Sequence, residues 1–308
     1  MPSQSDRPIK IGLLLPETEG QMDGASARWS DLLAMTHKAE EIGFDSVWVT
    51  DHFIHREEGL EDRGPWECWS LMAAIAAVTS RVEIGSLVLC TGFRNPALLA
   101  KMAETVDEIS AGRLILGLGA GWNEPEYKAF GYPFDHRVGR FEEAIQIISG
   151  LLKDGAIDFR GRFYSAEDCV IRPRGPRAKG APILIGSNGE RMLELTAQYA
   201  DIWNAWFSDT DNDVEKIKPL LAKVDAACLK VGRDPKSLER SFAIVCAVGP
   251  HGPSTMSSPP LRGTPQELAG KLREYADLGV SHLQVWLEPA TLAGVEAFAP
   301  VLQELDRG

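Results

Sequence analysis

The 308-residue chain has fewer basic than acidic residues, few cysteines and no long hydrophobic run. Its 32 lysines and arginines stand against 44 aspartates and glutamates, so the formal net charge is -12. Nucleic-acid surfaces need clustered lysine and arginine, so we expect no nucleic-acid partner. No apolar stretch approaches the roughly 20 residues of a membrane span, and the run at 11–15 is too short for a signal-peptide core. The sequence therefore predicts a soluble, cytoplasmic protein without a membrane partner.

Common catalytic and redox motifs are also missing. The five cysteines are widely separated and form no Cys-x-x-Cys pair, which is typical of a cytosolic chain with reduced thiols. There is no G-x-S-x-G, no Ser/His/Asp signature and no Walker loop. These absences argue against a serine hydrolase and a P-loop enzyme. The acidic charge does not exclude a single phosphorylated cofactor.

What the chain does contain is one pattern repeated eight times: a short Val/Ile/Leu run, a loop and a segment with helical periodicity. One of these helices has clear ends, with Asn95 at the cap, Pro96 in the first turn and Gly112 beyond the end. The expected strands are residues 9–15, 46–50, 82–89, 114–118, 183–185, 201–204, 241–248 and 282–287. Eight such units predict a single (β/α)8 TIM-barrel domain over residues 1–308, with a doubly wound sheet as the second choice.

Additional segments interrupt the repeat after strands 2, 4 and 7. The loops 53–65 and 251–263 follow the second and seventh strands, and both should border the carboxyl face of the barrel, where active sites form. Residues 158–172 are predicted to form a small hairpin before the fifth strand. The loops 53–65 and 251–263 would select the substrate, whose identity the sequence does not disclose.

The stretch 112–123, G-R-L-I-L-G-L-G-A-G-W-N, runs from the fourth strand into three glycines, Gly117, Gly119 and Gly121. The spacing G-x-G-x-G differs from the G-x-G-x-x-G of a dinucleotide fold. Glycines here serve either close strand packing or the approach of backbone to a ligand. Trp122 and Asn123, which come next, favour ligand contact.

The second strand ends Trp48-Val49-Thr50-Asp51-His52, and strand alternation directs His52 toward the barrel interior. A lone histidine there is either a hydrogen-bonded rim residue or a functional one. His55 and Glu57 lie near His52 and suggest a metal site. No H-E-x-x-H or similar spacing supports it, so no metal ligands are assigned.

Polar residues also follow the fifth strand, at Ser187, Asn188 and Gly189. They form either a phosphate cradle at a helix N-terminus or a simple helix cap. Alternation in the eighth strand sends Gln284 and Trp286 inward, and Trp203 at the end of the sixth strand is expected to do the same. Such aromatic side chains could form walls for a planar ring.

Taken together, several segments resemble the bacterial luciferase-like superfamily. The similar motifs are V-W-V-T-D-H at 47–52, N-P-A-L-L-A-K at 95–101, the glycine stretch 112–122, G-x-P-F-x-x-R at 131–137 and the region 182–204. Within this superfamily the chain most resembles the coenzyme F420-dependent oxidoreductases, whose relatives use FMN. The resemblance implies a barrel that holds a deazaflavin or flavin at its carboxyl face, and a homodimer.

The resemblance also implies roles for particular residues. His52 would be the catalytic proton donor or acceptor, and a non-proline cis peptide would lie at Leu87-Val88. Ser187, Asn188 and Gly189 would take the phosphate. The complete set of implied cofactor-binding residues is Asp51, His52, Leu87, Val88, Leu89, Cys90, Thr91, Gly119, Ala120, Gly121, Trp122, Ser187, Asn188, Gly189 and Trp203.

The chain departs from one related group at Trp122. Sugar-phosphate dehydrogenases of this superfamily that use F420 carry a glutamate general acid at the matching position. Glu124 or Glu126 could replace it only if their loop folds inward.

The expected function is hydride transfer between ring carbon C5 of F420 and a small organic substrate. An FMN-dependent monooxygenase that uses externally reduced flavin is the nearest alternative. A metal-dependent hydrolase on the same barrel and a flavin-binding protein without catalysis are more distant ones.

Overall fold

The structure is a computed structural model that describes residues 7–56, 59, 61–249, 256 and 258–307. The chain divides into two compact units. The first unit comprises Met1–Trp48 and Trp203–Gly308, and the second comprises Val49–Ile202.

Parallel strands form one closed sheet, in the order β3-β2-β1-β11-β10-β9-β8-β5-β4 with a further pairing of β3 with β5. The strands are β1 (Lys10–Leu14), β2 (Ser46–Val49), β3 (Glu83–Ser86), β4 (Leu89–Cys90), β5 (Leu114–Gly119), β8 (Ile183–Gly186), β9 (Ile202–Ala205), β10 (Glu239–Ala247) and β11 (His282–Glu288). Because β3 and β4 are two parts of the predicted third strand, the order is that of an eight-stranded barrel. The predicted (β/α)8 fold is confirmed.

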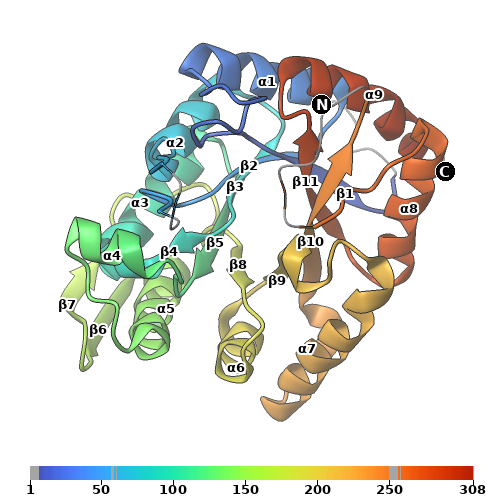
Figure 1. The fold of residues 1–308 in the computed structure, drawn as a ribbon. Helices are drawn as coiled ribbons and strands as arrows, with labels where there is room; N and C mark the ends of the chain where they lie inside the picture. The colour runs from blue at the N-terminus through green and yellow to red at the C-terminus, as the bar shows by residue number, and fades with distance from the viewer. Residues whose placement is uncertain (1–6, 57–58, 60, 250–255, 257, 308) are drawn as a thin grey trace. The chain divides into compact units, whose positions relative to one another are not determined.

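In the first unit, helices cover the outer face of β1, β10 and β11 (Figure 1). These helices are α1 (Trp29–Ile42), α7 (Lys218–Lys230), α8 (Pro265–Asp277) and α9 (Leu292–Asp306). A capping box begins α8: the Thr264 side chain accepts a hydrogen bond from Glu267 N, and the Glu267 carboxylate accepts one from Thr264 N. Three short 3-10 helices also belong to this unit: η2 (Phe207–Asp209), η3 (Val214–Ile217) and η4 (Pro235–Ser237).

In the second unit, helices alternate with β3, β5 and β8. They are α2 (Cys68–Val78), the 3-10 helix η1 (Thr91–Phe93), α3 (Pro96–Ile109), α4 (Glu124–Phe130), α5 (Arg137–Asp154) and α6 (Glu190–Tyr199). Asn95 caps α3 as predicted, because its side chain accepts hydrogen bonds from Ala97 N and Leu98 N. Helix α4 was not predicted, since seven residues with proline in the first turn carry too little periodicity to indicate a helix.

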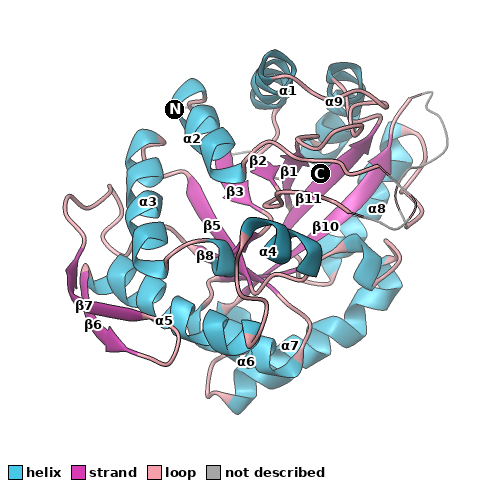
Figure 2. Ribbon diagram, turned by 60° about the vertical axis from the view of Figure 1, so that its left-hand side comes forward, coloured by secondary structure: helices cyan, strands magenta, loops and turns pink. Residues whose placement is uncertain are grey.

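The predicted hairpin is present as β6 (Ala156–Arg160) and β7 (Ser165–Val170), an antiparallel pair that lies beside α5 (Figure 2). The Glu143 carboxylate on α5 accepts hydrogen bonds from the backbone N–H groups of Arg162, Phe163 and Tyr164 at the hairpin turn. A side chain of α5 therefore fixes the tip of the hairpin.

The two long loops differ in how far the structure describes them. Within 53–65, His55 and Arg63 form an antiparallel bridge and Arg56 pairs with Asp62, whereas residues 57, 58 and 60 lie outside the described residues. In the predicted loop 251–263, residues 251–255 and 257 also lie outside them.

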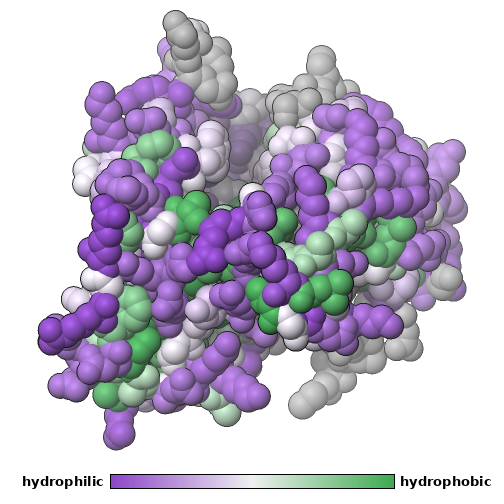
Figure 3. Space-filling view, turned by 90° about the horizontal axis from the view of Figure 1, so that it is seen from below, coloured by the Kyte–Doolittle hydropathy of each residue, from purple (hydrophilic) through white to green (hydrophobic). Residues whose placement is uncertain are grey.

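Hydrophilic residues dominate the face of the molecule in Figure 3, and hydrophobic residues form separate patches on it. Among the described residues, none of the helices has both the length and the apolar character needed to cross a bilayer.

Candidate functional site

His52 follows β2 and contacts a carboxylate from α4. Its Nδ1 lies 3.0 Å from Oε1 and 3.3 Å from Oε2 of Glu126, and Phe53 N donates to Oε2 over 2.9 Å. Glu126 is only 2% exposed, whereas the His52 side chain is 18% exposed. The loop after β5 therefore folds inward, and Glu126 is the acidic partner that the residue at position 122 does not provide.

Two further rings surround the imidazole of His52. The ring centroid of His55 lies 4.7 Å away and that of Trp122, in edge-on orientation, 5.5 Å away. Trp122 is 67% exposed, so it borders the imidazole from the solvent side. With Nδ1 engaged by Glu126, Nε2 is the ring atom suited to exchange a proton with a substrate.

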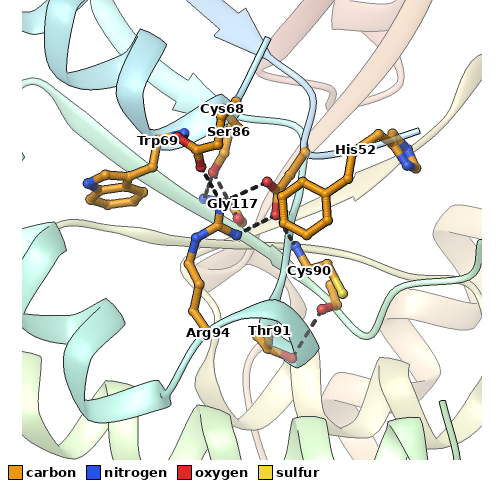
Figure 4. Close-up of polar contacts among 12 residues, drawn as sticks. His52, Cys68, Trp69, Ser86, Cys90, Thr91, Arg94 and Gly117 are labelled. Atoms are coloured by element: carbon orange, nitrogen blue, oxygen red, sulfur yellow. Dashed lines mark hydrogen bonds and ion pairs between the residues drawn. The ribbon is translucent and has the colours of Figure 1, made fainter. Parts of the chain in front are cut away.

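Asp51 points into a buried ion-pair network. Its carboxylate accepts a hydrogen bond from Cys90 N over 2.9 Å and two from Arg94 over 2.6 and 2.9 Å, and Arg94 also binds Glu67 over 2.7 Å. Figure 4 shows Arg94 at the centre of this group and the His52 ring directed away from it. Although burial alone would lower the pKa of Arg94, its hydrogen bonds and ion pair with Asp51 raise it above the ordinary value.

The Asp51 network joins the segment after β2 to the end of β4 and to the residue before the Asn95 cap. Because both carboxylate oxygens have protein donors, the placement of Asp51 favours a scaffold role over the expected cofactor contact. Arg94, which directly precedes the Asn95 cap, is thus a structural centre of the site.

Close packing explains the glycines within β5 and just after it. A Cβ at Gly117 would lie 1.9 Å from the Ser86 carbonyl oxygen, and one at Gly119 would lie 2.7 Å from Val88 Cγ2. At Gly121, where φ is +76°, a Cβ would lie 2.2 Å from Tyr127 Oη. Of the two explanations left open for this stretch, the structure supports strand packing directly.

The interruption between β3 and β4 contains the Leu87-Val88 cis peptide bond, as the resemblance implied. Val88 is partly exposed, and its methyl groups face both Gly119 and Gly186. Leu87, Leu89, Cys90 and Thr91 are buried, and Thr91 Oγ1 donates to Gly119 O over 3.2 Å. Among the residues of this segment, Val88 is therefore the one whose side chain reaches the surface between two strand ends.

The side chains of Tyr127 and Cys90 contact the glycine loop at residues 119–121. The Tyr127 hydroxyl lies 2.8 Å from Cys90 Sγ and donates to Ala120 O over 3.0 Å. Burial raises the pKa of Cys90 to about 12 and also raises that of Tyr127. Both groups are consequently neutral near pH 7, and Cys90 is not suited to act as a thiolate nucleophile. From α5, Arg137 adds a hydrogen bond to Gly121 O over 2.8 Å.

At the N-terminus of α6, the cap residue is Gly189, and no side-chain cap hydrogen bond forms there. Ser187 Oγ instead lies 2.9 Å from Thr196 Oγ1, and Asn188 and Gly189 are exposed. The cap position is therefore Gly189 rather than Ser187 or Asn188. An exposed helix start of this kind suits an anionic group.

Trp203, in the first unit, lies on the opposite side of its strand from the one expected. It is fully buried and packs edge-on against Phe242, with ring centroids 5.2 Å apart. The next residue, Asn204, donates to Gln284 Oε1 over 2.9 Å and to Ser241 Oγ over 3.0 Å. Because Asn204 shares its face with Gln284, the expected alternation for β9 was wrong by one residue, and the placement of Trp203 does not support a cofactor contact.

Metal ligation finds no support either. Within the described part of the chain, no group of three or more His, Cys, Asp or Glu residues is arranged to hold a metal ion. Glu57, part of that earlier hypothesis, lies outside it.

Comparisons with known proteins agree with the fold. A family model described as luciferase-like monooxygenase matches residues 9–252. A pyrimidine monooxygenase, RutA of Methylorubrum populi, is 38% identical over 213 residues, which are 66% of this chain and 54% of that protein. An F420-dependent glucose-6-phosphate dehydrogenase of Amycolatopsis mediterranei is 39% identical over 179 residues, 56% of this chain and 51% of the relative. The chain thus spans about half the length of these curated relatives.

Solved structures show the same architecture. An F420-dependent secondary alcohol dehydrogenase, in complex with an F420-acetone adduct, superimposes with a TM-score of 0.78 at 19% identity. The match covers 96% of this chain and 99% of that one. At this identity the likeness supports the barrel fold alone.

Proposed function

Because the chain belongs to the luciferase-like monooxygenase family, we propose that it is an oxidoreductase that transfers hydride between coenzyme F420 and a small organic substrate. The observation that carries this proposal is the half-buried imidazole of His52, held by Glu126 at a strand end on the carboxyl side of the barrel. Hydride transfer to or from an organic substrate is accompanied by movement of a proton, which an imidazole suits. The similarity to the F420-dependent dehydrogenase of A. mediterranei supports this choice of cofactor.

The residues present fit such a cofactor. Val88 and the backbone of Gly119, Ala120 and Gly121 would border the ring, and Trp122 would lie at its edge. The exposed start of α6, at Ser187 to Gly189, would hold the phosphate through its amides and side chains. When bound, F420 supplies a ring carbon, C5, that accepts or donates hydride.

The chain's own residues would then divide the remaining work. His52 Nε2 would take or return the substrate proton, while Glu126 stays on Nδ1. The Asp51-Arg94 pair would keep the strand ends in place, and Trp122 would limit access of water from the solvent side.

Binding and turnover of purified protein test the proposal. We expect F420 to bind, and His52→Asn to reduce hydride transfer by about 100- to 10,000-fold with F420 affinity changed only a few-fold. His136→Asn is the matched control, since that histidine is exposed and has φ +51°, a conformation that asparagine tolerates. Tight binding of FMN without binding of F420 would overturn the proposal. Full activity of His52→Asn would remove His52 from it.

The second candidate is an FMN-dependent monooxygenase, which the 38% identity to RutA supports. Tight FMN binding, together with oxygen uptake that depends on added reduced flavin and substrate, would establish it. The metal-dependent hydrolase alternative lacks support, since the part of the chain that the structure describes holds no metal-ligand cluster.

A further inference from the structure

Helix α4 is fixed on both sides of Glu126. The next residue, Tyr127, is 1% exposed, and its hydroxyl binds Ala120 O. Its own carbonyl accepts the N–H of Gly131, which ends the helix in a left-handed conformation. Backbone movement of Glu126 would therefore break contacts in the glycine loop and at the helix end.

An aromatic cluster also ties α4 to the segment that carries His52. Phe53, which directly follows His52, packs on Phe130 at the end of α4 and on Phe93 of η1, with ring centroids 4.6 and 4.5 Å apart. Phe93 in turn packs on Tyr127 at 4.9 Å. These rings hold the residue after His52 and the residue after Glu126 in one packed group.

The Glu126 carboxylate spans two consecutive residues of this segment. One oxygen, Oε1, lies 3.0 Å from His52 Nδ1, and the other, Oε2, accepts the N–H of Phe53 over 2.9 Å. The two contacts fix both the position of the carboxylate and the rotation of the imidazole. An ionised carboxylate only accepts hydrogen bonds, so its partner nitrogen must carry the hydrogen.

We propose that Glu126 is a positioning residue that holds His52 as the Nδ1–H tautomer and thereby makes Nε2 the atom that accepts the substrate proton. The tautomer follows from the contacts of this chain alone, and only the use of Nε2 in turnover rests on the proposed function. In the oxidising direction, the substrate C–H bond would break with its electron pair leaving as hydride, and F420, when bound, would supply the acceptor for that hydride. The substrate O–H or N–H bond breaks with its proton passing to Nε2, and a C=O or C=N bond forms. The resulting imidazolium is then paired with the Glu126 carboxylate.

Nitrogen NMR of the protein without cofactor tests the tautomer directly. With 15N-labelled histidine, long-range 1H–15N correlations at pH 8 distinguish a protonated ring nitrogen from an unprotonated one, and His52→Asn identifies the His52 signals. We expect Nδ1 protonated and Nε2 unprotonated in the wild-type protein. Protonation of Nε2 in the wild-type protein would refute the proposal without use of any Glu126 variant.

Two substitutions separate charge from shape. Glu126→Gln keeps the size of the side chain but lets an amide donate, so we expect a mixed or Nε2–H tautomer for His52. Glu124→Gln is the matched control, because Glu124 occupies the first turn of the same helix but is exposed. The control should leave the His52 signals unchanged. Unchanged His52 signals in a folded Glu126→Gln protein would also count against the proposal.

Turnover then tests the consequence. We expect Glu126→Gln to lower kcat about 100-fold with KM within about three-fold, and Glu126→Asp to recover part of kcat. A loss that falls on KM alone, or no recovery by aspartate, would indicate that Glu126 does not position the proton acceptor. If the tautomer is as expected but F420 does not bind, the proposed function fails while the assignment of Glu126 to His52 stands.

Discussion

Gly121 combines a left-handed backbone conformation with very little room for a side chain. A Cβ there would lie 2.2 Å from Tyr127 Oη and 2.6 Å from Cys90 Sγ, at φ +76°. We expect Gly121→Ala to lower the free energy of unfolding by about 2 to 4 kcal/mol, from overpacking together with left-handed strain. Urea denaturation followed by circular dichroism measures this loss.

Gly131 provides the control for the conformational part of that loss. It has a nearly equal φ of +77°, but a Cβ there would meet nothing within 4 Å. Gly131→Ala should therefore cost about 1 kcal/mol. Equal losses at the two positions would show that Tyr127 and Cys90 can move aside, and that Gly121 is required only for its backbone conformation.

For single residues, the sequence predicted where a side chain lies more reliably than which side chain it contacts. His52 could be placed at a strand end because alternation within one strand is local, and the family motif located the cis bond at Leu87-Val88. The pairing of His52 with Glu126 joins residues 74 positions apart, and no local pattern encodes that contact. The predicted inward orientation of Trp203 was wrong, because a four-residue strand gives too few alternating positions to show which side faces inward.

Among elements, the segment between β7 and β8 is held to α3 by buried ion pairs. Arg177 Nε donates to Asp107 Oδ2 over 3.0 Å, and the Asp107 side chain is 2% exposed. Arg177→Met removes the cation. The buried Asp107 carboxylate then keeps the hydrogen bond that Leu114 N donates over 3.3 Å. We expect a loss of about 2 to 4 kcal/mol in unfolding free energy, measured by urea denaturation.

A surface ion pair in the hairpin gives the comparison for that loss. Arg160 on β6 and Glu167 on β7 lie 3.0 Å apart, with side chains 75% and 57% exposed. Arg160→Met should change stability by less than about 1 kcal/mol, because solvent screens exposed pairs. A cost at Arg177 no larger than at Arg160 would mean that the segment before β8 is held by packing rather than by charge.

The predictable elements were those with clear capping residues at their ends or with a long periodic pattern. Helix α3 begins at Pro96 after the Asn95 cap, as predicted. Helix α4 was missed because it is short, and it supplies Glu126 to the site. The site was therefore less predictable than the fold, since it depends on the shortest α-helix of the second unit.

For the whole molecule, His282 links stability to pH. Complete burial, with a smaller contribution from Lys10, lowers the pKa of His282 to about 3, and Nε2 lies 2.7 Å from Ser46 Oγ. Between pH 3 and the unfolded value of 6.5, the unfolded chain binds more protons, so stability falls as the pH falls. This one group should remove about 2.5 kcal/mol between pH 7 and pH 4.5.

Unfolding free energies at the two pH values test this linkage. His282→Gln lacks the titrating ring, so its stability should fall by about 2.5 kcal/mol less than that of the wild-type protein over the same interval. His136→Gln, at an exposed position, should retain the wild-type dependence. If all three proteins lose the same amount, His282 is protonated within the folded state and its surroundings accommodate the charge.

Helix α4 also limits how the loop after β5 can change in length. Glu126 and Tyr127 are consecutive, and they reach His52 on one side and the Ala120 carbonyl on the other. One residue inserted within the helix before Glu126 would turn the following residues by about 100° and direct both side chains elsewhere. Length variation is tolerable only beyond Gly131, where the helix has ended. Homologues that differ in their substrates should therefore gain or lose residues there and keep the five-residue step from Gly121 to Glu126 intact.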